Sequence, residues 1–471
     1  MLDEMEIEAM VKIDVLNDDK TSPVPRKTSS FVFWNRTRMY ILVLSLVCLT
    51  LSQINSLTFT FTVICMDDLI EAHHRTNQSG LHFMESTSHK AMLFSGTAIG
   101  SMLGLVPSVP LISRFGVRNI LTLSGVISAF GSFFFPIAVS HYYLLFLCRI
   151  LQGIGISTVF TAVAVIPGSW SPNNEIGTFL AILSCALQIG SVICMAVSGI
   201  LCESFLGWRS IYYMFGVITF LCYIGFFFSY KDTPFFHRNV SQKELTRIQT
   251  GKLETKGREP VPYFAIVKDP CVIACLISVF GGNLGFFMLV LYGPTYLKHV
   301  LHFDVQGTGL ASAFPFFLSA LAKIVAGQVS DRMDYVSEKT RFIMCAAVSQ
   351  VGMAIAYVAM AWTTDKMIAQ IAYTLAIVFS GINVMGTVKC LQLRCRQHVH
   401  FGISVVSFTA NIIQFVGPIF VGFIVPDNSA QQFALLFYIV AGVVIVTNLP
   451  FPFLSTAEPG PYVHKTRNND S

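Results

Sequence analysis

Residues 142–167, YYLLFLCRILQGIGISTVFTAVAVIP, form an apolar stretch that is long enough to cross a bilayer and carries one charge, Arg149. A hydrocarbon core of about 30 Å needs about 20 helical residues, and backbone in lipid must bond to itself. A guanidinium at that depth costs from ~2.5 kcal/mol to more than ~10 kcal/mol, so it normally faces a protein-lined interior and has a function. The stretch therefore predicts a transmembrane helix with Arg149 directed into a helical bundle.

Similar stretches recur along the chain. Hydrophobic residues make up 54% of the 471 residues and charged residues only 12%, against about 25% charged in soluble domains. The sequence therefore predicts an all-α membrane protein, and not a β-barrel of short alternating segments. The twelve expected transmembrane helices are 39–65, 91–113, 118–139, 142–166, 176–202, 209–230, 271–297, 307–330, 341–362, 367–390, 400–425 and 431–454.

The lysines and arginines are distributed unevenly about these helices. With both termini cytoplasmic, Arg149 and Lys323 lie inside helices, and 24 of the 31 basic residues flank the cytoplasmic ends. This distribution follows the positive-inside rule, so the net charge of +5 reflects topology and not nucleic-acid binding. The basic residues on the opposite side are Arg75, Lys90, Arg209, Lys298 and Lys366.

The chain divides into two weakly similar halves. Ser113-Arg114-Phe115-Gly116 follows the second expected helix, and a stretch ending in Asp331-Arg332 follows the eighth. Such repeats indicate two pseudo-symmetric six-helix bundles with a substrate site between them near the midplane. We expect a cytoplasmic N-terminal tail (1–38), an N-terminal bundle (39–230), a cytoplasmic linker (231–270), a C-terminal bundle (271–454) and a cytoplasmic C-terminal tail (455–471).

Two helices carry polar faces, and a third carries small residues. Ser404, Ser407, Asn411 and Gln414 share one face of the eleventh helix, and Ser184, Gln188 and Ser191 share one face of the fifth. These faces indicate that the two helices line a polar cavity. The alternative is that the polar side chains form hydrogen bonds between helices, which stabilise a membrane protein by only ~0.6 kcal/mol per bond. The series Gly96, Gly100, Gly104 on the second helix predicts close approach by another helix.

A series of short motifs runs along residues 40–455. The motifs are Arg149-Ile-Leu-Gln-Gly-Ile-Gly, Trp170-Ser-Pro172 with Glu175, Gln188-Ile-Gly190, Gly207-Trp208 through Gly216, Tyr292-Gly-Pro294, Gly327-Gln-Val-Ser-Asp331-Arg332, and Gly402-Ile-Ser with Asn411 and Gly417-Pro418. In this order they resemble the anion:cation symporter branch of the major facilitator superfamily, solute carrier family 17, which includes sodium–phosphate cotransporters, sialin and vesicular glutamate transporters. The resemblance implies alternating access, an anionic substrate, and sodium, proton or voltage as the driving force.

The chain also departs from the family pattern. The family often has an acid seven residues after the fourth-helix arginine, where this chain has Ile156. The arginines that the glutamate branch has in its first helix and near the position of Gly282 are absent. These departures disfavour glutamate transport and proton coupling through the fourth helix.

The resemblance and the polar faces define the candidate site. Arg149 is expected to contact the anion through its two-pronged guanidinium, with a structural arginine capped by neighbouring carbonyls as the alternative. For Lys323 two interpretations remain, snorkelling to the interface or an anion contact in the cytoplasmic vestibule. Hydrogen bonds to the substrate would come from Gln152, Gln188, Asn411 and Gln414, and the aromatic walls of the substrate site from Phe286 and Tyr292. The cytoplasmic gate would consist of Ser113, Arg114, Gly116, Asp331 and Arg332.

Other features limit the function class. The sequence has no nucleotide loop and no hydrolase motif, so we expect a transporter and not an enzyme. No metal site and no cofactor are expected beyond a coupling ion, sodium or proton. The twelve cysteines are interpreted mainly as small apolar residues, with no pair placed for a disulfide. Asn77 begins a glycosylation sequon on the external side.

The sequence thus predicts a secondary active transporter for an organic anion or inorganic phosphate. It would act as a monomer in the plasma membrane or in a lysosomal or vesicular membrane, with no nucleic-acid partner. A passive anion facilitator and a non-transporting sensor or scaffold are the alternatives, because the missing acid at Ile156 weakens the case for ion coupling.

Overall fold

The computed structural model describes residues 35–75, 83–172, 175–249, 262–332 and 336–463, and the regular structure in these ranges is entirely helical. Twelve stretches within them are long and apolar enough to cross a membrane. The prediction of an all-α, multi-pass integral membrane protein is therefore confirmed.

The first half of the chain supplies six of the spans. The helix α4 contains two of them, 87–108 and 114–138, joined at Gly116, whose φ of 81° favours glycine. A break at Cys185 divides the fifth span into α6 and α7. The helices of this half are α2 (Thr37–Thr62), α4 (Thr87–Ala138), α5 (Tyr142–Trp170), α6 (Ile176–Ser184), α7 (Ala186–Glu203) and α8 (Gly207–Ser229).

The second half supplies the other six spans. Its helices are α11 (Pro270–His299), α12 (Val305–Arg332), α13 (Glu338–Trp362), α14 (Lys366–Asn383), α15 (Lys389–Cys395), α16 (Val399–Ile424) and α17 (Ala430–Asn448). A π-helical segment, η4 (Val384–Val388), joins α14 to α15 within one span. The short elements of the chain are η1 (Val63–Cys65), α3 (Asp67–Arg75), η3 (Pro234–Phe236), α9 (Gln242–Gln249), α10 (Tyr263–Val267), η5 (Arg396–His398) and α18 (Pro450–Leu454).

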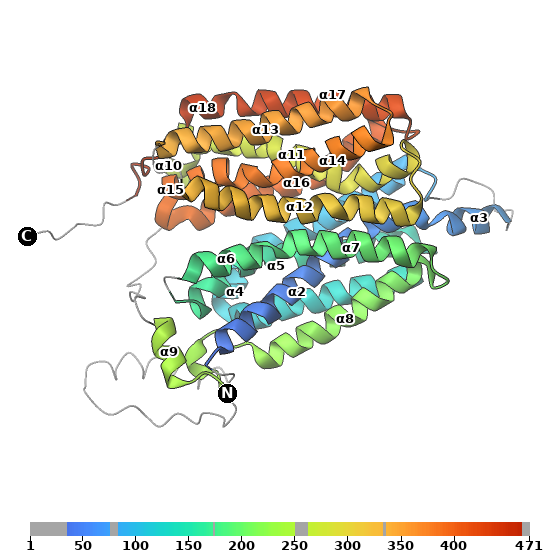
Figure 1. The fold of residues 1–471 in the computed structure, drawn as a ribbon. Coiled ribbons are helices and arrows are strands. Elements are labelled where there is room, and N and C mark those ends of the chain that lie inside the picture. The colour runs from blue at the N-terminus through green and yellow to red at the C-terminus, as the bar shows by residue number, and fades with distance from the viewer. Residues whose placement is uncertain (1–34, 76–82, 173–174, 250–261, 333–335, 464–471) are drawn as a thin grey trace, which may run out of the picture.

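The two halves lie side by side with their long helices running in similar directions (Figure 1). They meet where α7 packs against α12 and where α4 packs against α16. The helices α9, α10, α15 and α18 lie at one end of the bundle, which we call the tail end, and α3 lies at the other, which we call the α3 end (Figure 1).

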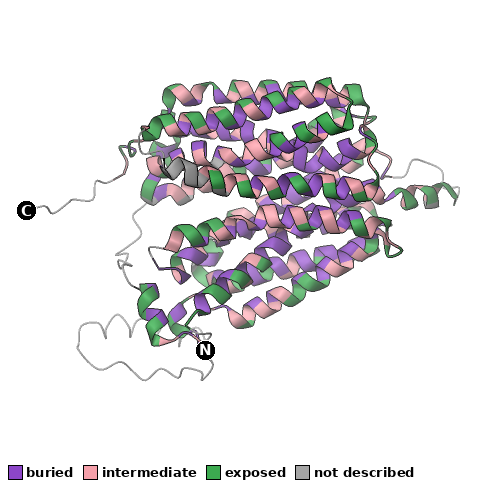
Figure 2. Ribbon diagram, in the orientation of Figure 1, coloured by how far each residue is buried: buried purple, intermediate pink, exposed green. Residues whose placement is uncertain are grey.

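Large apolar side chains cover much of the outer surface. Phe205, Tyr143, Phe423 and Phe228 are 97%, 84%, 83% and 76% exposed. Exposed residues recur along the outward faces of the helices, and buried residues recur along the faces between them (Figure 2). A monomer in water rarely exposes apolar patches of more than a few hundred Å², so lipid is the solvent that this surface suits.

The prediction that no cysteines pair in a disulfide is wrong. Cys65, at the end of η1, and Cys202, near the end of α7, form a disulfide at the α3 end. Both thiols lie in the last turn of an apolar span, where the sequence pattern does not distinguish them from packing residues. Their pairing depends on two helix ends meeting in space.

The close approach predicted for the second helix is observed between α4 and α5. A Cβ atom added to Gly100 would lie 2.0 Å from the carbonyl oxygen of Ile150, and one added to Gly153 would lie 2.1 Å from that of Thr97. Because the opposing atoms belong to backbone, a side chain at either glycine would force the two helices apart.

We therefore expect Gly153→Ala to lower the melting temperature of the detergent-solubilised protein, since overpacking typically costs about 1–3 kcal/mol. The matched control is Gly168→Ala on the same helix, where an added Cβ would meet nothing within 4 Å. Thermal unfolding followed by size-exclusion chromatography measures both. Equal melting temperatures for the two variants would contradict the close packing of α4 on α5.

Candidate functional site

Arg149 lies within the first half with none of its surface exposed. Its Nε donates a hydrogen bond to the carbonyl oxygen of Leu93 at 3.1 Å, and Nη2 donates to that of Ser56 at 3.2 Å. Its Nη1 donates to Oε1 of Gln152 at 2.5 Å, one turn along the same helix. The guanidinium carbon lies 4.9 Å from the ring centroid of Phe59. The charge is therefore held by α2, α4 and α5 of one bundle.

This geometry corresponds to the alternative of an arginine capped by neighbouring carbonyls. Gln152 is also buried, and its amide nitrogen donates to the hydroxyl of Ser132 at 3.2 Å. The structure brings Arg149 and Gln152 together, but it turns both toward protein. Their contact with an anion remains a prediction.

The other predicted amides differ in lacking hydrogen-bond partners. The Oε1 atom of Gln188 on α7 is buried and accepts no hydrogen bond within the described chain. Asn411, which is 5% exposed, and the half-buried Gln414 on α16 also have no side-chain partner among the described residues. A buried polar group without a partner costs about 1–3 kcal/mol, so these three amides are the ones suited to a polar ligand.

Aromatic side chains close the interface between the halves toward the α3 end. The ring of Tyr292 on α11 packs against Phe94 on α4, with centroids 5.3 Å apart. Beside them, Ser95 donates a hydrogen bond to the carbonyl oxygen of Phe415 on α16 at 2.7 Å. Tyr292 thus contacts the opposite bundle, whereas Phe286 lies against Phe316 within its own half, with centroids 6.2 Å apart.

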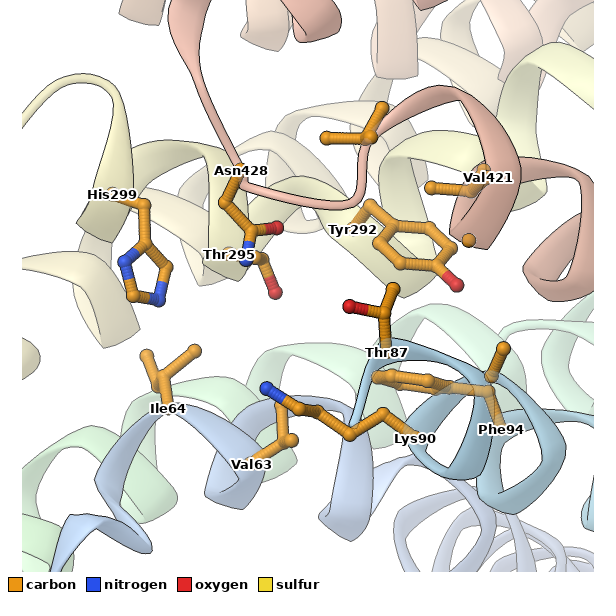
Figure 3. Close-up of a pocket in the computed structure, with 13 residues that line it drawn as sticks. Val63, Ile64, Thr87, Lys90, Phe94, Tyr292, Thr295, His299, Val421 and Asn428 are labelled. Atoms are coloured by element: carbon orange, nitrogen blue, oxygen red, sulfur yellow. The ribbon is translucent and has the colours of Figure 1, made fainter. Parts of the chain in front are cut away.

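A cavity of about 60 Å³ lies beside this closure and is lined from both halves. In Figure 3, Lys90 and Thr87 face Tyr292, Thr295 and His299 across it. The tyrosine ring therefore separates this small hollow from the middle of the bundle.

Lys323, the second basic residue inside a span, lies between the halves. Its ammonium donates a hydrogen bond to the hydroxyl of Ser184 on α6 at 3.4 Å, next to the break between α6 and α7. The side chain therefore bonds across the interface instead of snorkelling to the end of its helix. Within the described residues, no carboxylate pairs with Lys323 or Arg149.

The predicted gate residues are only partly described. The side chains of Ser113, Asp331 and Arg332, and Asn77 of the sequon, lie outside the described residues. Arg114 is exposed and stacks on Phe115 at 5.4 Å. The gating role of these residues and the glycosylation of Asn77 remain predictions.

Among the predicted gate residues, Gly116 is the one whose structural surroundings explain the residue type. A Cβ on Gly116 would lie 2.4 Å from Oδ2 of Asp232, whose Oδ1 accepts the backbone N–H of Arg118 at 3.0 Å. Only glycine leaves room here for the carboxylate to cap the third span. Asp232 is not among the residues predicted from the sequence. Its position just after the sixth span, at the same end of the bundle as Gly116, is the feature of the sequence that points to this contact.

A second acidic residue at the tail end, Glu175, was predicted only as part of a family motif, without its partners. Glu175 pairs with Arg38 at 3.2 Å and with Arg247 at 2.8 Å, and so joins the start of α2 to α9 of the linker. In addition, Glu244 of α9 accepts the backbone N–H groups of Thr37 and Arg38 at 3.1 and 2.9 Å. The linker helix is therefore fastened to the first bundle.

Comparisons with known proteins agree with this architecture. A family model described as Major Facilitator Superfamily matches residues 46–400. The fold is similar to that of a bacterial homologue of the human lysosomal transporter Spinster, with a TM-score of 0.67 and 13% identity over 88% of this chain and 96% of that one. The predicted fold class is thus confirmed.

Curated relatives agree with the predicted branch. The chain is 25% identical to human sialin over 397 residues, covering 83% of this chain and 79% of sialin. It is 27% identical to a putative inorganic phosphate cotransporter of Drosophila melanogaster over 398 residues, covering 80% and 74% of the two chains. The resemblance to the anion:cation symporter branch is confirmed by these matches.

The contacts of Arg149 generate a stability prediction. Lysine cannot reproduce three differently directed N–H contacts, so Arg149→Lys leaves buried carbonyls unpaired at about 1–3 kcal/mol each. We expect Arg149→Lys to lower the melting temperature clearly, whereas Gln188→Leu, which removes an unpartnered amide, leaves it unchanged or raised. A melting temperature for Arg149→Lys equal to that of the wild type would contradict the structural role of the guanidinium.

Proposed function

This chain belongs to the major facilitator superfamily, and we propose that it is a secondary transporter that moves a small anion, inorganic phosphate or an organic anion, by alternating access. Among its relatives are sialin and proteins named as phosphate cotransporters or sodium-dependent phosphate transport proteins. Twelve spans in two halves, which meet where α7 packs on α12 and α4 on α16, support the proposal.

The observation that carries the proposal is the positive charge of Lys323 between the two halves. No carboxylate pairs with Lys323 or Arg149 in the described chain, but Arg149 is bonded to carbonyls of its own bundle, whereas Lys323 has only a serine hydroxyl. Charges within a membrane are costly and are compensated by a partner or by a substrate. A cation between two bundles, in a protein that also holds interior amides without partners, favours an anion as the substrate.

The contacts between the halves support a conformation closed at the α3 end. There Lys298 pairs with Asp67 at 3.2 Å, and Thr87 donates to the carbonyl oxygen of Pro426 at 3.1 Å. Toward the tail end, a hollow of about 280 Å³ separates α4 from α16. Its lining residues are Leu105, Val106, Ser404, Val405 and Phe408. Alternating access requires the α3-end contacts to break as the hollow closes.

The chemistry of the two ends supports placing both termini in the cytoplasm. The disulfide Cys65–Cys202 lies at the α3 end, whereas Cys271, Cys390 and Cys395 at the tail end are free. Disulfides persist in oxidising compartments and are rare in the cytosol. The α3 end would therefore be extracellular or luminal, in the plasma membrane or in a lysosomal or vesicular membrane.

Uptake into proteoliposomes tests the function. We expect one of labelled phosphate, urate, sialate or aspartate to accumulate above its equilibrium concentration when a sodium, proton or voltage gradient is imposed. The control is the same panel without gradients. Uptake of a labelled anion only to its equilibrium concentration would favour the passive facilitator. No uptake of any of these anions by correctly oriented protein would favour the sensor or scaffold.

Lys323 gives a sharper prediction. Losing a charge-assisted hydrogen bond costs about 1.5–3 kcal/mol, so Lys323→Met should raise KM for the transported anion about 10- to 100-fold. Lys323→Arg should retain most of the affinity, and Lys339→Met at the exposed start of α13 is the control. An unchanged KM in Lys323→Met would exclude this ammonium as an anion contact.

A further inference from the structure

Three thiols converge at the tail end of the second half. Cys271 and Cys275 lie one turn apart in the first turns of α11, and Cys390 lies on α15. All three are buried, and their Sγ atoms lie within 4.8 Å of one another. The Sγ atoms of Cys271 and Cys390 are 3.9 Å apart. The proposed transport function uses none of these thiols.

A fourth potential ligand completes the cluster. The backbone carbonyl oxygen of Thr456, just after α18, lies 3.6 Å from Sγ of Cys390 and 4.0 Å from Sγ of Cys271. We propose that Cys271, Cys275, Cys390 and the Thr456 carbonyl form a binding site for one Zn²⁺ ion.

The distances among Sγ of Cys271, Sγ of Cys390 and the Thr456 oxygen fit zinc, and Sγ of Cys275 lies within 4.8 Å of both sulfurs. Zinc prefers four tetrahedral ligands with Zn–S of about 2.3 Å and Zn–O of about 2.1 Å, which place neighbouring sulfurs about 3.8 Å apart and sulfur about 3.6 Å from oxygen. The corresponding distances of 3.9 and 3.6 Å match within a few tenths of an ångström. Thiolates are also the soft ligands that exclude Mg²⁺ and Ca²⁺.

The surroundings hold the ligands in place. Asp269 caps the start of α11 by accepting the backbone N–H of Cys271 at 2.9 Å, and its other oxygen pairs with Arg394 at 2.7 Å. Arg394 also donates to the carbonyl oxygens of Glu458 and Pro459 at 3.1 and 3.2 Å. This arrangement fixes the chain around Thr456 against the bundle independently of the thiols.

The charges in the site also suit a divalent ion. Binding releases the thiol protons, so three thiolates and Zn²⁺ leave one net negative charge, whereas Cu⁺ would leave two in a buried site. Arg394 and Asp269, which lie beside Cys271, form an ion pair and add no net charge to the site. The ion would tie α11 and α15 to the segment that follows α18.

Metal analysis of the full-length protein tests the site without any transport measurement. We expect about one equivalent of Zn²⁺ to remain after dialysis against a weak chelator. Co²⁺ added after removal of zinc should give thiolate-to-cobalt charge-transfer absorption and the visible bands of tetrahedral cobalt.

Variants locate the binding. Cys275→Ser and Cys390→Ser should each abolish stoichiometric zinc, and Cys345→Ser, which alters a half-buried thiol outside the cluster, should not. A strong chelator should lower the melting temperature of the wild type but not that of Cys275→Ser. Should the variants fail to elute as folded protein, the wild-type cobalt spectrum decides alone. Zinc content near zero in the wild type, octahedral cobalt bands, or equal zinc in Cys275→Ser and the wild type would each overturn the proposal.

Discussion

The structure depends on one constraint, that lipid offers no hydrogen-bond partner to a buried charge or to backbone. Every span is accordingly helical, and Arg149 is surrounded by acceptors from three helices of one bundle. Close packing of α4 on α5 makes this possible, because Gly153 brings their backbones into contact. The large apolar side chains exposed on the outer surface follow from the same constraint.

The two interior cations have different surroundings. Arg149 is compensated by carbonyls that belong to one bundle, and these contacts persist if the bundle moves as a unit. Lys323 reaches a hydroxyl of the opposite bundle, and that contact changes whenever the halves separate. A ligand that competes for Lys323 would therefore be coupled to the arrangement of the halves, as alternating access requires.

The two ends of the bundle differ in how they are held. At the α3 end, a disulfide joins η1, just after α2, to α7, and Lys298, Ser95 and Tyr292 bridge the halves. At the tail end, the ionic contacts of the described residues stay within each half, through Glu175 in the first and Asp269 in the second. Each half is therefore braced internally at the tail end.

The sequence by itself determined the number of spans, their class and the family. About 20 consecutive apolar residues can satisfy their backbone hydrogen bonds in lipid only as a helix. It also identified Arg149, Gln152 and Lys323 as unusual, since a polar group within a span stands out from its neighbours. Only the tertiary structure decided the partners of these groups: Leu93 and Ser56 for the guanidinium and Ser184 for the lysine. It also left Oε1 of Gln188 without a partner among the described residues. It alone paired Cys65 with Cys202, and it alone gathered Cys271, Cys275 and Cys390. Periodicity determines the face of a helix on which a residue lies, but the partner depends on how distant helices cross, and a single sequence does not encode that in any local pattern.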